Sequence, residues 1–160
     1  MSLKEEFIKV GYTENDYNEI RNSYSLINMK DETISIHLKD IFAFFLKNGY
    51  SKEEVIKMTK TLPAIYGYSK ENMKQKIDFY DSIDMHVLAV IDTKYLMQSV
   101  NLSYARYSFY MDKGINIDID NYRKLFIGQK NFEKSYGITK EELLKKYDYN
   151  KFKEEKEKSL

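Results

Sequence analysis

The fold is decided by the stretch GYSKEE at residues 49–54, because it ends one helix and begins the next. Glycine can adopt the left-handed conformation that terminates a helix. Ser51 can then accept a hydrogen bond from the free amides of the following helix. Glu54, three residues further on, can accept from the amide of Ser51, as in a capping box. The stretch therefore predicts two helices that meet at Gly49.

The same joint recurs along the chain, with a Gly, then a Tyr or Ile, then a capping side chain. An aromatic residue precedes three of the glycines by four positions. Between Gly49 and Gly114 a further joint is expected at Asp84, where the glycine is missing. The other copies are Gly11-Tyr12-Thr13 with Asp16, Gly137-Ile138-Thr139 with Glu142, and Gly114-Ile115-Asn116 without the acid. Such recurrence predicts a stack of helical units.

Apolar spacing and capping residues predict where the helices lie. Proline disfavours the helical conformation of the residue before it, so we expect a break at Leu62-Pro63. Residues 115–121 alternate apolar and polar side chains, which indicates either a short strand or an irregular connection. The predicted helices cover residues 3–10, 13–22, from Asp31 to Gly49, from Ser51 to the break, from Ser69 to about 83, Tyr104–Lys113 capped by Asn101 or Ser103, Tyr122–Tyr136, and from Thr139 to about Tyr147.

These elements predict an all-α protein, a short irregular α-solenoid of three to four helical repeats. We expect a single domain over residues 1–150 and a mixed-charge, frayed tail over residues 151–160.

The charge and residue composition limit the classes of function and the compartments that the protein can be expected to have. The formal net charge is +1, whereas a dedicated nucleic-acid binder usually has a clear basic excess. Cysteine is absent, which excludes disulfides and thiolate chemistry and fits a reducing compartment. The acidic first residues are unlike a secretory or transit signal, and no apolar run approaches the ~20 residues of a membrane span. We therefore expect a cytoplasmic protein with no membrane partner.

Residues 49–84 resemble one repeat of the mitochondrial transcription termination factor (mTERF) family. The shared pattern is a Gly-aromatic-Ser opening, a first helix ending at Leu-Pro, a short second helix, and a Ser-capped third helix with an aromatic end. The positions that fall on it are Gly49, Ser51, Glu54, Leu62, Pro63, Ile65, Ser69, Met73, Ile77, Phe79 and Tyr80. The resemblance implies a curved stack of helix triplets whose concave groove takes nucleic acid.

Nucleic-acid binding would use basic side chains for phosphates. The candidates lie at helix starts and on polar faces: Lys57, Lys60, Lys70, Lys74, Lys76, Arg106, Arg123 and Lys124. The alternative is an ordinary solvated helical surface, because acids such as Glu53, Glu71 and Asp78 are interleaved with them. DNA or RNA is the leading partner, and a protein partner, with the chain as an interaction module, is the alternative.

Tyr104, Tyr107 and Tyr110 are spaced by three and form an aromatic stripe on a helix. This stripe is either a surface for stacking or partner binding, or packing between repeats.

No pattern indicates catalysis, a cofactor or a metal. His37 and His86 are the only histidines and lie far apart in the sequence. Residues 116–121 begin like a calcium loop, but Asn121 and Ile127 replace the glycine and glutamate that such a loop needs. No phosphate-binding glycine loop or nucleophile motif is present. We therefore expect a non-enzymatic protein.

Overall fold

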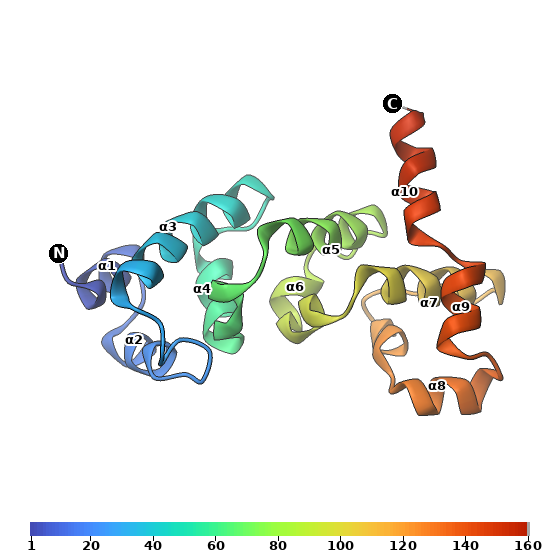
Figure 1. Ribbon diagram of the computed structural model, residues 1–160, viewed down its shortest axis with the longest axis horizontal. Helices are drawn as coiled ribbons and strands as arrows, with labels where there is room; N and C mark the ends of the chain where they lie inside the picture. Colours follow the sequence, from blue (N-terminus) through green and yellow to red (C-terminus); the bar gives the residue numbers. More distant parts are fainter. Residues whose placement is uncertain (160) are drawn as a thin grey trace. The chain divides into compact units, whose positions relative to one another are not determined.

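The computed structural model describes residues 1–159, and over these residues all regular structure is helical (Figure 1). This confirms the all-α prediction. Contacts divide the chain into two compact units. Unit 1 comprises residues 1–77 and 89–94, and unit 2 comprises residues 78–88 and those from 95 onward. The single domain over residues 1–150 and the solenoid stacking of the repeats stay predictions.

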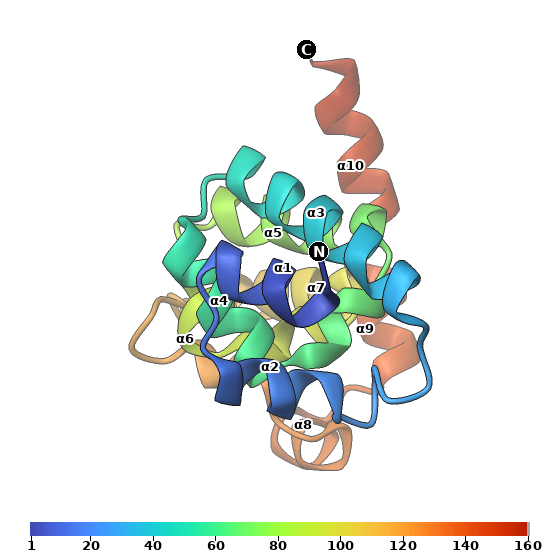
Figure 2. The ribbon, with the colours of Figure 1, turned by 90° about the vertical axis from the view of Figure 1, so that its left-hand side faces the viewer.

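Unit 1 is built on four helices and a short 3-10 helix. They are α1 (Leu3–Val10), α2 (Glu14–Arg21), α3 (Asp31–Lys47), α4 (Lys52–Thr61) and η1 (Pro63–Gly67), followed by the first part of α5 (Lys70–Ser82). Helix α1 contacts both α2 and α3, and Figure 2 shows it between them. The core takes one apolar stripe from each element, including Phe7, Ile20, Ile34, Ile41, Phe45, Val55, Met58 and Ile65.

The core of unit 1 also contains a polar cluster. The Tyr12 hydroxyl lies 2.5 Å from the Thr59 hydroxyl and 2.6 Å from the Tyr66 hydroxyl. Thr59 in turn donates to the Val55 carbonyl at 2.9 Å. Burial raises the pKa of Tyr12 to about 12. Because each hydroxyl has a partner, the three can be buried without the cost of an unpaired polar group.

Unit 2 continues the helical pattern. Most of α6 (Leu88–Ile91) and the start of η2 (Thr93–Met97) belong to unit 1. Unit 2 contains the end of η2, followed by α7 (Val100–Asp112), η3 (Tyr122–Phe126), α8 (Gln129–Tyr136), α9 (Lys140–Lys146) and α10 (Tyr149–Lys158). Helix α7 is central, because α9, α10 and η3 all contact it. Its buried face, with Ala105, Phe109 and Tyr110, packs with Leu125, Phe132 and Leu143.

The predicted joints are confirmed, including the one that lacks glycine. At the first joint Gly11 has φ 132°, and the Tyr12 amide donates to the Phe7 carbonyl at 3.1 Å. At the third, Asp84 has φ 58°, and the Met85 amide donates to the Tyr80 carbonyl at 2.8 Å. Aspartate is one of the few side chains that tolerate this conformation. Asp84 therefore follows the end of α5 as Gly11, Gly49, Gly114 and Gly137 follow the ends of α1, α3, α7 and α8.

The predicted caps are present at four starts, and at one of them Ser69 accepts from the Asn72 amide at 3.3 Å at the beginning of α5. Thr13 and Ser51 each form a complete capping box, with Asp16 and Glu54 respectively. Thr139 accepts from the Glu142 amide at 3.2 Å. These local bonds explain why α2, α4, α5 and α9 begin where they do.

Three local predictions were wrong. Helix α7 is capped by Ser99, not by Asn101 or Ser103, because Ser103 is buried and accepts from the Gln98 side chain instead. Of the two alternatives left open for residues 115–121, the irregular connection is confirmed and the strand is not. These residues close a turn in which the Asn121 side chain accepts from the Asp118 amide at 2.7 Å.

The other two concern continuity. The helix expected over Tyr122–Tyr136 is divided into η3 and α8, with Gly128 as the N-cap of α8. The tail expected to be frayed is largely helix α10, capped by Asp148. Phe152 in α10 stacks on Tyr104 at 4.9 Å between ring centroids, which gives this segment a packing partner.

Candidate nucleic-acid interface

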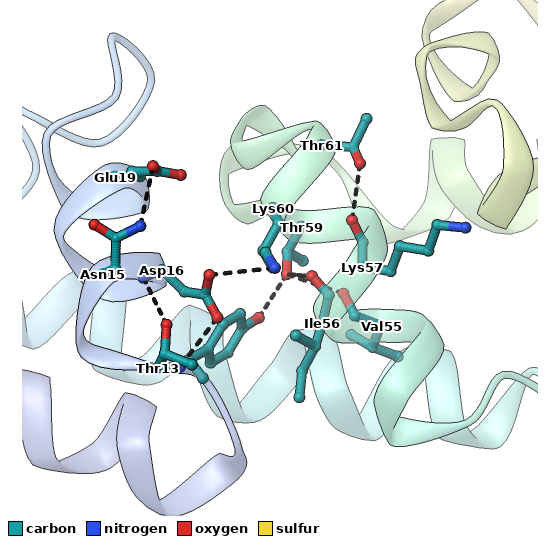
Figure 3. Close-up of polar contacts among 11 residues, drawn as sticks. Thr13, Asn15, Asp16, Glu19, Val55, Ile56, Lys57, Thr59, Lys60 and Thr61 are labelled. Carbon is teal, nitrogen blue, oxygen red and sulfur yellow. Dashed lines mark hydrogen bonds and ion pairs between the residues drawn. The ribbon is translucent and has the colours of Figure 1, made fainter.

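Helix α4 presents Lys57 and Lys60 in different directions (Figure 3). Lys60 Nζ lies 3.2 Å from Asp16 Oδ1 on α2. Lys57 is exposed and points away from that pair. The two lysines are therefore about one helical turn apart, but Lys60 is paired with a carboxylate whereas Lys57 points away from that pair.

Asp16 performs two tasks at this place. Its carboxylate accepts from the Thr13 amide at 3.0 Å and pairs with Lys60. The bond from Thr13, reinforced by Lys60, lowers the pKa of Asp16 below its ordinary value. The charge on Lys60 is thus partly neutralised by a residue that also begins α2.

Helix α5 carries three further candidates. Lys70 Nζ lies 3.1 Å from Asp40 Oδ2 on α3. Lys74 is exposed, and Lys76 is half-buried. Burial lowers the pKa of Lys76, because desolvation disfavours its charged form. An anion bound beside Lys76 would offset that cost.

Arg106 is a correction to the predicted site. Its side chain is only 1% exposed, and its guanidinium lies 4.6 Å from the centre of the Phe132 ring. It donates to the carbonyls of Leu125 at 3.0 Å and Ile127 at 2.6 Å, and to Gln129 Oε1 at 3.2 Å. Arg106 therefore ties α7 to η3 and to the start of α8, and it is not a surface phosphate ligand.

Arg123 and Lys124 are exposed on η3. The Arg123 guanidinium lies 6.0 Å from the centre of the neighbouring Tyr122 ring. The Lys124 carbonyl accepts from the buried Tyr110 hydroxyl at 2.9 Å, which fixes the backbone that carries these two side chains. They form a small basic pair on unit 2.

The tyrosine stripe is not an open aromatic surface. Tyr110 is fully buried in unit 2, and burial raises its pKa. Tyr104 is half-buried and stacks on Phe152. Tyr107 is half-buried and contacts Phe79 edge-on at 5.9 Å. Packing between elements, the alternative left open by the sequence, accounts for all three rings.

The pairing of the candidate lysines with Asp16 and Asp40 was not predicted from the sequence. Asp16 was identified only as a capping acid, and Asp40 is 30 residues from Lys70, so sequence spacing gives no sign of the contact. Arg106 could have been recognised, because it lies three residues before Phe109 and four before Tyr110, on the apolar face of α7.

Residues 1–159 contain no group of three or more histidine or carboxylate side chains placed to hold a metal ion. Within the same residues, no helix is both long and apolar enough to cross a membrane.

Comparison with models of protein families shows which family the chain belongs to. The family model mTERF matches residues 4–133, which covers most of the sequence and all of the repeat joints up to Gly114. Comparison with curated proteins and with solved structures finds no match. This match agrees with the all-helical fold and with the repeated joints. The chain is therefore a member of the mTERF family, whose proteins are generally helical-repeat proteins that bind nucleic acid.

Proposed function

We propose that this protein binds DNA or RNA without catalysing a reaction, through lysines on α4 and α5 of unit 1. The observation that carries the proposal is the family match over residues 4–133. The basic side chains named for unit 1 are Lys57, Lys60, Lys70, Lys74 and Lys76. Arg123 and Lys124 form a secondary basic pair on unit 2.

The ion pairs of Lys60 and Lys70 do not prevent this role. Both lysines are more than two-fifths exposed in their pairs with Asp16 and Asp40. The Lys70–Asp40 pair is exposed on both sides, and such pairs contribute only about 0–1 kcal/mol, so a phosphate can compete for the Lys70 ammonium group. The Asp16 side chain is only 11% exposed, so a phosphate competes less easily for Lys60. The carboxylates do reduce the local positive potential. We therefore expect modest affinity that is strongest at low salt.

The absence of cysteine supports our proposal of a reducing compartment such as the cytoplasm. Imaging of the protein fused to a fluorescent reporter tests it, and accumulation inside an organelle would count against it.

The binding proposal is tested by comparing two double variants. Lys57→Ala/Lys74→Ala removes two proposed phosphate contacts. Lys130→Ala/Lys134→Ala removes the same charge from two exposed positions of α8 that are outside the proposed surface. Fluorescence anisotropy with labelled single- and double-stranded oligonucleotides measures the affinity of each.

We expect Lys57→Ala/Lys74→Ala to weaken binding roughly tenfold at low salt, since each lost lysine removes one counterion-releasing contact. The control should stay within about twofold. Equal losses in the two variants would mean that net charge, not this surface, carries the binding. No binding by the unaltered chain at low salt would remove the proposal.

A further inference from the structure

We propose that a groove between α1 and α3 in unit 1 docks an acidic amphipathic helix of a partner protein. This groove, called here the α1–α3 groove, has a volume of about 520 Å³. It is lined by Met1, Glu6, Lys9, Val10, Leu38, Lys39, Phe42, Leu46 and Lys52. The inference is separate from nucleic-acid binding, because none of the proposed phosphate ligands lines the groove.

The floor of the groove is apolar and continues an internal stripe out to the surface. Leu38, Phe42 and Leu46 follow one another at four-residue spacing along α3. Leu38 and Phe42 are buried, whereas Leu46 is 50% exposed. Val10, at the end of α1, completes the floor and is half-buried. A continuous apolar strip that opens to solvent between two helices is typical of a protein-binding site.

The rim of the groove is basic. Lys9, Lys39 and Lys52 come from α1, α3 and α4, and all three are exposed. Among residues 1–159 none of them pairs with a carboxylate, whereas Lys4 pairs with Glu14 and Lys70 with Asp40. The positive charge at this rim is therefore available to a ligand.

The one acid of the groove is already engaged. Glu6 Oε1 accepts from the Ser35 hydroxyl at 2.9 Å, a bond that also ties α1 to α3. Glu6 therefore points a partnered oxygen toward α3. Three basic side chains around an apolar floor are complementary to a ligand that carries acids beside large apolar groups.

An amphipathic helix with this composition fits best. Helices bind in grooves through apolar anchors spaced at i, i+3, i+4 and i+7, and the floor offers a strip of matching apolar contacts. Glutamates beside those anchors would face Lys9, Lys39 and Lys52. A nucleic acid could place phosphates on the lysines but would leave the exposed Leu46 without an apolar partner.

Binding of a designed peptide tests the inference. The probe is a fluorescein-labelled helical peptide of about 15 residues, long enough to be helical when bound, with leucine at the anchor positions and glutamate elsewhere. The control peptide keeps every leucine and replaces each glutamate by lysine. Affinities for the full chain are measured by anisotropy at low salt. We expect the acidic peptide to bind at least about tenfold more tightly than the basic one.

Three variants locate the site. Leu46→Glu removes an anchor contact, and Lys39→Glu reverses one rim charge. Lys57→Glu makes the same charge change at an exposed lysine outside the groove. The first two should each weaken the acidic peptide by about fivefold or more, and Lys57→Glu should stay within about twofold. Because Lys39 and Leu46 are exposed, all three variants should unfold at denaturant midpoints close to that of the unaltered chain.

Several outcomes would overturn the inference: no binding of the acidic peptide, equal binding of both peptides, or affinity that Leu46→Glu and Lys39→Glu leave unchanged. Oligonucleotide binding that depends on Lys39 and displaces the peptide would assign the groove to nucleic acid instead. Failure of nucleic-acid binding alone, with the peptide results as expected, would remove the proposed function and leave the groove intact.

Discussion

Replacing Arg106 by alanine tests the core of unit 2 most severely. The substitution removes the donor to the Ile127 carbonyl and the donor to the Gln129 side chain. It also removes one of the two donors to the Leu125 carbonyl, which keeps its bond from the Gln98 side chain. A buried acceptor left without its donor costs about 1–3 kcal/mol. The packing of the guanidinium on Phe132 is lost as well. We therefore expect the free energy of unfolding to fall by about 3–5 kcal/mol, because the lost hydrogen bonds add to the cavity left by a large, fully buried side chain.

Urea denaturation followed by far-ultraviolet circular dichroism measures this loss. Arg123→Ala is the matched control, because Arg123 is exposed on η3. It should change the free energy of unfolding by less than about 0.5 kcal/mol. Arg106→Lys should be intermediate, since lysine keeps the charge but lacks the planar fork that reaches two carbonyls. A loss below about 1 kcal/mol for Arg106→Ala, accompanied by weaker oligonucleotide binding, would refute the buried role.

Substitutions at three further positions probe the joints and caps by the same denaturation assay. Asp84→Ala should lower the free energy of unfolding by about 1 kcal/mol, because alanine resists φ 58°, whereas Asp84→Gly should not lower it; equal losses would argue against the strained joint. Ser51→Ala should cost about 1 kcal/mol through loss of the capping box with Glu54, and no loss would mean that the cap does not stabilise α4. The pKa of Asp16 is lowered in the folded protein, so its contribution to the free energy of unfolding is present above its ordinary pKa of 3.8 and is lost as the pH falls through the folded value. Asp16→Asn should therefore remove about 1 kcal/mol at neutral pH and weaken the loss of stability at acidic pH. An unchanged loss of stability at acidic pH would contradict the role assigned to Asp16.

The helix boundaries that could be predicted from sequence are those set by bonds between near neighbours. Thr13 reaches Asp16 and Ser51 reaches Glu54 within one turn, so the capping boxes can be read directly from spacing. Asp84 was placed correctly as a joint because of its distance from the neighbouring glycines, although its left-handed conformation is visible only in the structure. The choice of Ser99 over Ser103 needed knowledge of which serine the core buries.

The parts that could not be predicted depend on partners far away in the sequence. Arg106 looks like a surface cation until the carbonyls of Leu125 and Ile127, 19 and 21 residues later, are placed beside it. Residues 151–158 are mostly charged, so the sequence does not indicate that Phe152 packs against Tyr104 of another helix. For the same reason the lysines of unit 1 could be selected by type, but their pairing with carboxylates could not.

The salt dependence of oligonucleotide binding tests the central claim most directly. If the five lysines of unit 1 each neutralise one phosphate, the logarithm of the association constant should fall with the logarithm of salt concentration at a slope of about −4.5 for duplex DNA and about −3.5 for a single strand. Because some of these lysines share their charge with carboxylates, slopes between about half and all of these values agree with the account. A slope near zero, or no detectable binding at low salt, would contradict it.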